Sequence, residues 1–148
     1  MRPLPTLRPE YIQKRLFVLD MDGTIYLGDQ LFPWTMPFLE ALTRAGAQYI
    51  FLTNNSSRTS DEYVDKLQRL GVPAQPDNVL TSGDATIELL KGEGQWQRLF
   101  LLAPPAVTAA FEEAGFIMDK ETPQAVVMAY DTTLEYGRLV TFCHHVRA

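Results

Sequence analysis

The composition of the 148-residue chain is that of a globular protein, with 46% hydrophobic and 21% charged residues. At this length we expect one domain of ordinary size that buries about 70% of the surface of its unfolded chain. A formal net charge of −5 and the lack of any Lys/Arg cluster argue against a general nucleic-acid-binding protein. No apolar segment approaches membrane-spanning length. The single cysteine, Cys143, excludes an internal disulfide, which fits a reducing cytoplasm.

The first clear element is a run of four apolar residues, 16–19, that leads directly into Asp20. Before it, residues 1–14 contain three prolines and no apolar core, so they are expected to form an arm and not a signal peptide. A short, unbroken apolar run predicts a strand that is buried on both faces, as in a parallel sheet. Open α/β sheets bind ligands at the carboxyl ends of their strands, which is where Asp20 and Asp22 fall.

Three interpretations fit two aspartates that are followed by Gly23 and Thr24. The first is a strand that ends in an Asp-Gly turn. The second is an EF-hand calcium loop, which fails because its glycine must be the sixth residue of the loop, whereas Gly23 is the fourth from Asp20. The third is covalent phosphoryl transfer, with Asp20 as the nucleophile and Asp22 as the proton donor and acceptor. The residues alone leave the first and the third open.

Strands and helices alternate along the rest of the chain, as judged from apolar spacing and from helix start and stop residues. In chain order we expect a hairpin at 25–29, a helix at 37–45, a strand at 48–52, a helix capped by Ser60 and ended by Gly71, a strand at 78–81, a helix at 84–91, a strand at 99–103, a helix at 104–115, a strand at 125–130 and a helix at 133–146. This alternation favours an α/β fold with a parallel sheet and right-handed crossovers. A flexible break at 92–94 is the expected boundary between a core at 15–92 and a second domain at 95–148.

The second long strand of this series also ends in polar residues, Thr53 and Asn54. Parallel strands end at the same edge of a sheet, so these side chains should lie beside Asp20 and Asp22. A hydroxyl, an amide and the backbone N–H groups of the following loop can donate hydrogen bonds to phosphate oxygens. The alternative is that the segment 53–57 is ordinary loop sequence leading into a helix.

Together these residues resemble the motifs of the haloacid dehalogenase-like phosphohydrolases. The segment 20–24, Asp-Met-Asp-Gly-Thr, resembles the first motif of that family, and 53–55, Thr-Asn-Asn, resembles the second. The chain is most similar to the subfamily that includes p-nitrophenyl phosphatases, phosphoglycolate phosphatases and the bacterial phosphatases encoded with N-acetylglucosamine catabolism. Further features of that subfamily are Thr81 with Ser82, and the segment 126–131 followed by Tyr136.

The resemblance implies a Rossmann-like core, incomplete here, and part of an inserted α/β cap that selects the substrate. It implies a phosphatase in which Asp20 attacks a phosphate monoester to form an aspartyl-phosphate, while Asp22 protonates the leaving oxygen and then activates water. Thr53 would hold the phosphoryl group, and Asn54 would shape the loop beside it. Mg²⁺ would bind through the Asp20 carboxylate and the backbone carbonyl of Asp22. The implied partner is a small phosphorylated metabolite, and neither nucleic acid nor a membrane.

Two further motifs of the family, a lysine and an acidic Gly-Asp-rich turn, follow the cap, and this sequence has no counterpart of either. We therefore expect a fragment or a shortened product. The alternatives to a phosphatase are an inactive phosphate- and metal-binding module and phosphotransfer to an acceptor other than water. In this fold the strand of the acidic turn pairs beside 16–19, so that apolar edge would be open. An open edge invites aggregation, and a homo-oligomer or a strand-exchanged dimer is the resulting expectation.

Overall fold

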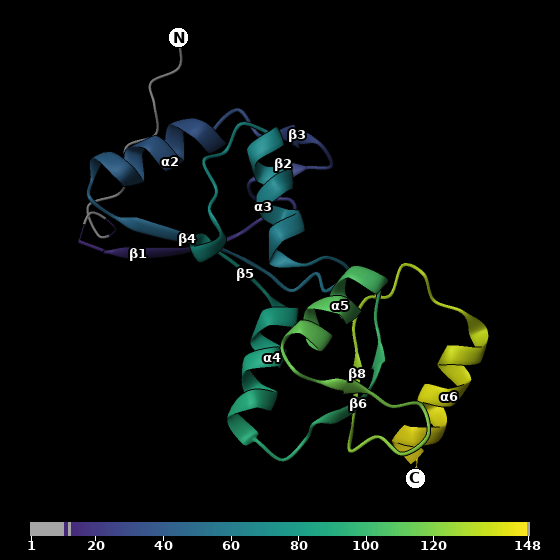
Figure 1. The fold of residues 1–148 in the computed structure, drawn as a ribbon. Coiled ribbons are helices and arrows are strands. Elements are labelled where there is room, and N and C mark those ends of the chain that lie inside the picture. The colour runs from purple at the N-terminus through teal and green to yellow at the C-terminus, as the bar shows by residue number, and fades with distance from the viewer. Residues whose placement is uncertain (1–10, 12, 148) are drawn as a thin grey trace. The chain divides into compact units, whose positions relative to one another are not determined.

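The computed structural model describes residue 11 and residues 13–147, so the arm expected at 1–14 falls largely outside the described residues. The chain divides into two compact units. The first unit comprises Met1–Thr53 and Tyr63–Leu80, and the second comprises Asn54–Glu62 and Thr81–Ala148. Each unit has its own strands and helices (Figure 1) and its own hydrophobic core.

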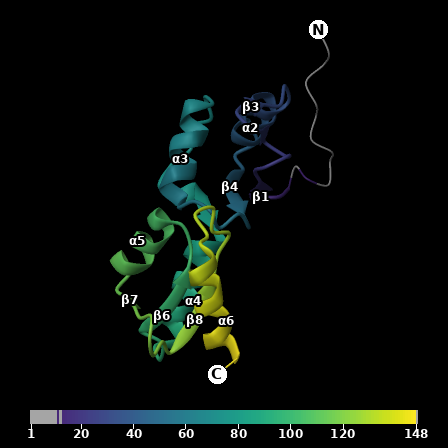
Figure 2. The ribbon, with the colours of Figure 1, turned by 90° about the vertical axis from the view of Figure 1, so that its right-hand side faces the viewer.

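The sheet of the first unit has the strand order β1-β4-β5. Its strands are β1 (Leu16–Asp20), β4 (Gln48–Thr53) and β5 (Val79–Thr81). β1 and β4, which lie side by side in Figures 1 and 2, are parallel, and Asp20 at the end of β1 lies opposite Leu52 of β4. Both strands therefore end at the same edge of the sheet.

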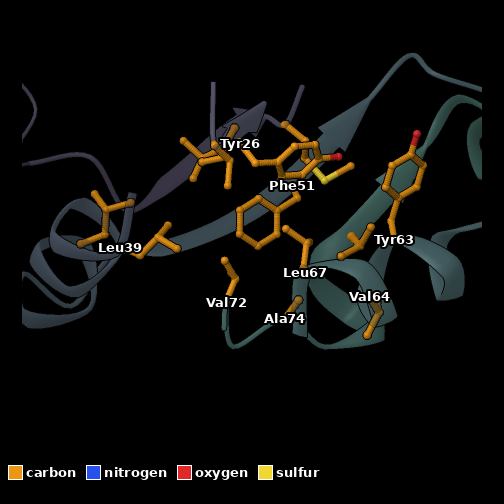
Figure 3. Packing of buried hydrophobic residues seen from close by; sticks show 13 residues of the cluster. Tyr26, Leu39, Phe51, Tyr63, Val64, Leu67, Val72 and Ala74 are labelled. Carbon is orange, nitrogen blue, oxygen red and sulfur yellow. The ribbon is translucent and has the colours of Figure 1, made fainter. Parts of the chain in front are cut away.

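Two helices contribute to the core on one face of this sheet. They are α2 (Thr35–Arg44) and α3 (Ser60–Arg69). Leu42 of α2 and Leu67 of α3 belong to the same buried cluster as Phe51 of β4, and Figure 3 shows Phe51 and Leu67 within it. Helix α2 forms the crossover between the parallel strands β1 and β4, which is the usual βαβ arrangement of an α/β fold.

The opposite face of this sheet is exposed, so the prediction that β1 is buried on both faces is wrong. Leu16 and Val18 expose 53% and 54% of their surface, and Leu52 and Leu80 expose 40% and 38%. Side chains alternate between the two faces of a strand, and the described helices α2 and α3 cover only the other face. Among the described residues β1 also pairs with a strand on one side only, as expected for an open edge.

A short hairpin, β2 (Tyr26–Leu27) and β3 (Gln30–Leu31), follows β1. It turns at Gly28 and Asp29, as the sequence predicts. The 3₁₀ helix η1 (Pro76–Asn78) leads into β5.

Helix α3 is capped by Thr59 and not by Ser60, which corrects the predicted cap. The N–H of Glu62 donates to Thr59 Oγ1 at 3.3 Å, and the N–H of Thr59 donates to Glu62 Oε2 at 2.9 Å. This reciprocal pair is a capping box. Ser60 instead donates through Oγ to Asp84 Oδ1 at 3.2 Å.

The second unit is built on a parallel sheet with the order β7-β6-β8. Its strands are β6 (Arg98–Leu102), β7 (Ile117–Met118) and β8 (Ala125–Met128). Strand β7 is not predicted from the sequence, because a two-residue strand has no recognisable periodicity. Strand β8 ends at Met128 and not at Tyr130 as expected.

The helices of the second unit are α4 (Ser82–Glu93), α5 (Pro105–Glu113) and α6 (Tyr136–Arg147). Residues of α4 and α5 share a buried cluster with Leu99 and Leu101 of β6. Figure 1 shows α4 and α5 on one side of β6 and β8, with α6 on the other side.

The parallel sheets and their helices confirm the predicted α/β class. No helix in the described part of the chain is long and apolar enough to cross a membrane.

The segment 92–94 is not a flexible break. Gly92 lies within α4, and Gly94 is the C-cap of that helix with a φ of +68°, a conformation that suits glycine. Leu90 of α4 is buried in the core of the second unit, so the helix belongs with β6 and α5. The expected division into a core at 15–92 and a cap at 95–148 differs from the two units, because both Asn54–Glu62 and α4 belong to the second unit. That division stays a prediction.

Candidate functional site

Asp20 and Thr53 end two neighbouring strands of the first unit. Asp20 is the last residue of β1 and is exposed, while Thr53 is the last residue of β4 and is 3% exposed. Asp20 lies opposite Leu52, the residue before Thr53. Thr24 donates a hydrogen bond through Oγ1 to Asp20 Oδ2 at 3.2 Å. The structure therefore places a carboxylate and a buried threonine at the carboxyl edge of one parallel pair, where α/β sheets bind ligands.

Asp22 lies in a tight loop directly after β1. Gly23 has a φ of +80°, a conformation that other residues rarely adopt. The carbonyl of Met21 accepts the N–H of Ile25 at 2.9 Å, and the carbonyl of Ile25 accepts the hydroxyl of the buried Thr35 at 2.6 Å. These bonds fold the loop back on itself, and Asp22 is left exposed two residues beyond the end of the strand.

Two hydroxyl groups that contact these carboxylates are not predicted as site residues from the sequence. The hydroxyl of Thr24 donates to Asp20 at 3.2 Å, and the phenol of Tyr26 donates to Asp22 Oδ2 at 3.4 Å. Each hydroxyl lies four residues after the aspartate that it contacts. This repeated spacing of four residues is the one feature of the sequence that could have indicated the two contacts.

Asn54 follows Thr53 in the chain but belongs to the second unit. Its backbone carbonyl accepts a hydrogen bond from Ser82 Oγ at 3.2 Å. The segment that begins at Asn54 is also held by Ser56, whose Oγ accepts the backbone N–H of Tyr130 at 2.8 Å. The predicted site residues are thus divided, with Asn54 in the second unit and the other three in the first.

The carboxylates of the first unit suit an open cation site. Mg²⁺ is commonly bound through one or two carboxylates together with waters and substrate phosphates. Asp20 and Asp22, which are both exposed, provide that kind of donor set through a carboxylate and a backbone carbonyl. Within residue 11 and residues 13–147, no three His, Cys, Asp or Glu side chains come together as a closed metal site. Water or phosphate oxygens would therefore complete the coordination of a bound ion.

A surface cavity of about 770 Å³ lies in the second unit, lined by residues of β6, α5 and α6. Arg138 lines it and donates to the carbonyls of Leu101 and Ala103 at 3.5 and 3.1 Å. The same side chain pairs with Asp131 at 2.8 Å. Among the described residues that line this cavity, none is a predicted site residue.

One protein family matches this chain over most of its length. The family, described as haloacid dehalogenase-like hydrolase, matches residues 17–117. That range contains both strand ends and the loop between β1 and β2, together with α4, α5 and β6. The match therefore covers the residues from which the candidate site is built.

Two similar proteins carry names that describe phosphate-ester chemistry. The chain is 29% identical over 131 residues to the 5'-nucleotidase YutF of Bacillus subtilis, which covers 88% of this chain and 51% of that protein. It is 27% identical over 128 residues to an acid sugar phosphatase of Staphylococcus aureus, which covers 86% of this chain and 49% of that protein. The chain spans about half the length of both relatives.

Solved structures share the fold. A 4-nitrophenylphosphatase from Thermotoga maritima is similar with a TM-score of 0.87 and 42% identity, over 92% of this chain and 52% of that one. A glycerol phosphate phosphatase from Mycobacterium tuberculosis, solved in complex with magnesium, is similar with a TM-score of 0.77 and 26% identity, over 89% of this chain and 40% of that one. The α/β arrangement seen here is thus that of known phosphatases.

Proposed function

This chain belongs to the haloacid dehalogenase-like hydrolases, and we propose from that premise that it hydrolyses small phosphate monoesters with Asp20 as the nucleophile. The observation that carries the proposal is the juxtaposition of strand ends. An exposed carboxylate at the end of β1 lies one register step from buried Thr53 at the end of the parallel strand β4. Neighbouring strand ends allow a nucleophile and a phosphate-binding hydroxyl to act on one phosphoryl group at this edge of the sheet.

The proposed reaction has two steps. In the first, a carboxylate oxygen of Asp20 attacks phosphorus, the P–O bond to the leaving group breaks, and Asp22 gives its proton to the leaving oxygen. In the second, Asp22 takes a proton from a water molecule whose oxygen attacks the aspartyl-phosphate, which releases phosphate and restores Asp20. The exposure of both aspartates allows substrate and water to reach them, and covalent catalysis of this kind divides one difficult step into two easier ones.

Thr53 and Asn54 are proposed to bind the phosphoryl group and shape the loop beside it. The position of Thr53 at the strand end supports its part, since a buried hydroxyl that donates to a phosphate oxygen is a strong contact. Asn54 is the next residue in the chain, and Ser82 fixes its backbone carbonyl. A fixed backbone supports a defined role for its amide in the loop.

Mg²⁺ is the proposed cofactor, held by the Asp20 carboxylate and the backbone carbonyl of Asp22. When bound, the ion offsets the negative charge of two anions that approach each other. The donor set described above supports this proposal, as does the magnesium complex of the similar glycerol phosphate phosphatase.

The proposed substrate is a small phosphorylated metabolite. The named relatives act on a sugar phosphate, a nucleotide, glycerol phosphate or a nitrophenyl phosphate, and all of these are small molecules with one feature in common, a phosphate ester. The net charge of −5 gives no electrostatic attraction to nucleic acid.

A second candidate function is phosphate and metal binding without turnover. It fits the same two exposed residues, Asp20 and Asp22, which can bind a cation together with water and phosphate whether or not turnover follows. Such a module would bind inorganic phosphate in the presence of Mg²⁺ but would release no product from a phosphate ester.

The test is the release of p-nitrophenol from p-nitrophenyl phosphate by the 148-residue chain, with and without Mg²⁺. Asp20→Asn exposes any contaminating phosphatase, and Asp29→Asn, at the turn between β2 and β3, is the matched control. Turnover that needs Mg²⁺, is lost in Asp20→Asn and persists in Asp29→Asn supports the phosphatase. Turnover no higher than that of Asp20→Asn would overturn it, and calorimetric binding of phosphate would then support the second candidate.

A further inference from the structure

Tyr26 contacts the loop that carries Asp22 in two ways. Its backbone carbonyl accepts the N–H of Gly23 at 2.8 Å, and the backbones of Asp22 and Tyr26 are paired as an isolated bridge. Its phenol donates to Asp22 Oδ2 at 3.4 Å. One residue thus holds both the backbone and the carboxylate of the proposed proton donor.

The ring of Tyr26 is itself firmly fixed. It is 0% exposed and belongs to the buried cluster that contains Phe51 and Leu67 (Figure 3). Lys66, the residue before Leu67 on α3, places Nζ 3.9 Å from the centroid of the ring. An ammonium group over an aromatic face is attracted by the negative charge of that face. A ring held by packing and by a cation gives its hydroxyl little freedom, so the Asp22 oxygen that it contacts is restrained as well.

We propose that Tyr26 is a positioning residue for proton transfer by Asp22, and that Lys66 stabilises Tyr26 in that position. The proposal rests on the proposed function. Asp22 must first give a proton to the leaving oxygen as its P–O bond breaks, and then take a proton from the water that displaces Asp20 from phosphorus. A hydrogen bond from Tyr26 to Oδ2 leaves Oδ1 available for both transfers.

The length of the contact is consistent with this role. At 3.4 Å it exceeds the usual O–H···O distance of about 2.7–2.8 Å. Hydrogen bonds of catalytic groups are often long without substrate and shorten in the reacting complex. We therefore expect the bond from Tyr26 to matter most when Asp22 transfers a proton.

The experiment compares two substrates whose leaving groups need different amounts of protonation. p-Nitrophenolate is a weak base and leaves with little help, whereas the alkoxide of glycerol phosphate needs the proton from Asp22. Tyr26→Phe should lower kcat for glycerol phosphate about tenfold more than for p-nitrophenyl phosphate, and Asp22→Asn should show the same bias more strongly. Tyr49→Phe, which removes a half-buried phenol from β4, should show no such bias.

The variants of Lys66 test the second part of the proposal. Lys66→Gln should show the leaving-group bias in a weaker form, and Lys66→Arg, which keeps a cation able to lie over the ring, should restore the wild-type ratio of the two kcat values. A purely structural role would lower both kcat values by the same factor.

The kinetic results distinguish failure of the proposed function from failure of the inference about Tyr26. A wild-type chain with no turnover beyond that of Asp20→Asn overturns the proposed function, and the inference falls with it. An active wild-type chain in which Tyr26→Phe lowers both kcat values equally, or in which Asp22→Asn shows no bias, overturns the inference and leaves the phosphatase standing. An active chain with the bias in Tyr26→Phe and none in Tyr49→Phe supports it.

Discussion

Thr53 places a single hydroxyl at the centre of the proposed chemistry. It is buried at the end of β4, so Thr53→Val changes the hydroxyl and little of the shape. We expect kcat/KM for p-nitrophenyl phosphate to fall about tenfold, which corresponds to the loss of one hydrogen bond of about 1–1.5 kcal/mol. Thr53→Ser keeps a hydroxyl and should recover most of the activity. An unchanged kcat/KM in Thr53→Val, with Thr53→Ser measured alongside, would remove Thr53 from the site.

The lowered pKa of Asp119, which directly follows β7, predicts that the stability of the chain depends on pH. The backbone N–H groups of Thr122 and Glu121 donate to its Oδ1 at 3.0 and 2.8 Å and, with Arg98 adding a smaller effect, hold the pKa of the Asp119 carboxyl below its ordinary value. Because the pKa is lower in the folded chain, the stabilisation is fully present above the unfolded pKa of about 4. It is lost as the pH falls through the folded pKa.

Asp119→Asn should therefore be less stable than the wild type at neutral pH and closer to it in acid. Urea denaturation at neutral pH and at about pH 3 measures the two differences. Glu121→Gln removes a neighbouring exposed carboxylate but keeps the backbone donor, and serves as the control. A deficit in Asp119→Asn that stays the same size in acid would contradict the assignment.

At the scale of elements, Arg138 on α6 completes the edge of β6. Its guanidinium donates to the carbonyls of Leu101 and Ala103 and pairs with Asp131, whose side chain is 2% exposed. Strand β7 reaches only as far as Leu99 on this edge. The arginine therefore occupies the place where a longer β7 would have bonded.

We expect Arg138→Met to lower the free energy of unfolding by about 2–3 kcal/mol, because it leaves a buried carboxylate without its cation. Arg138→Lys keeps the charge but not the planar fork of donors, so its loss should be smaller. Adding Asp131→Asn to Arg138→Met should recover part of the stability. Urea denaturation measures all three, and a loss in Arg138→Met below about 0.5 kcal/mol would show that water replaces the arginine at the edge.

The elements that the sequence predicts well are those with strong local signals. Strands β1 and β4 follow from their apolar runs, and so do the positions of Asp20 and Thr53 at the ends of these strands, whereas the roles of the site residues stay predictions. The contact between Tyr26 and Asp22 could not be predicted in the same way, because it depends on how the loop folds back. The exposed face of β1 is not predicted either, because the residues of a strand do not indicate which of its two faces the helices cover.

At the scale of the whole molecule, the described residues form two hydrophobic cores. One gathers around Phe51 and Leu67, and the other around Leu99 and Phe111. The proposed nucleophile and proton donor belong to the first unit, and the helix α4 that comes after β5 belongs to the second. A substitution in the second core therefore tests the second unit alone, whereas Tyr26 belongs to the first core and also contacts Asp22, so Tyr26→Phe tests the proposed chemistry as well.

The exposed face of β1, and its edge that no described strand pairs with, predict self-association. Leu16 and Val18 are more than half exposed on an edge strand, and such edges pair readily with other chains. Sedimentation equilibrium of the wild-type chain should show an average mass that rises with concentration, and Val18→Lys should reduce that rise because a charged side chain disfavours edge pairing. Val146→Lys, at a similarly exposed valine of α6, controls for the added charge. A wild-type chain that stays monomeric at every concentration would exclude the homo-oligomer, and an equal effect of both lysines would exclude β1 as its interface.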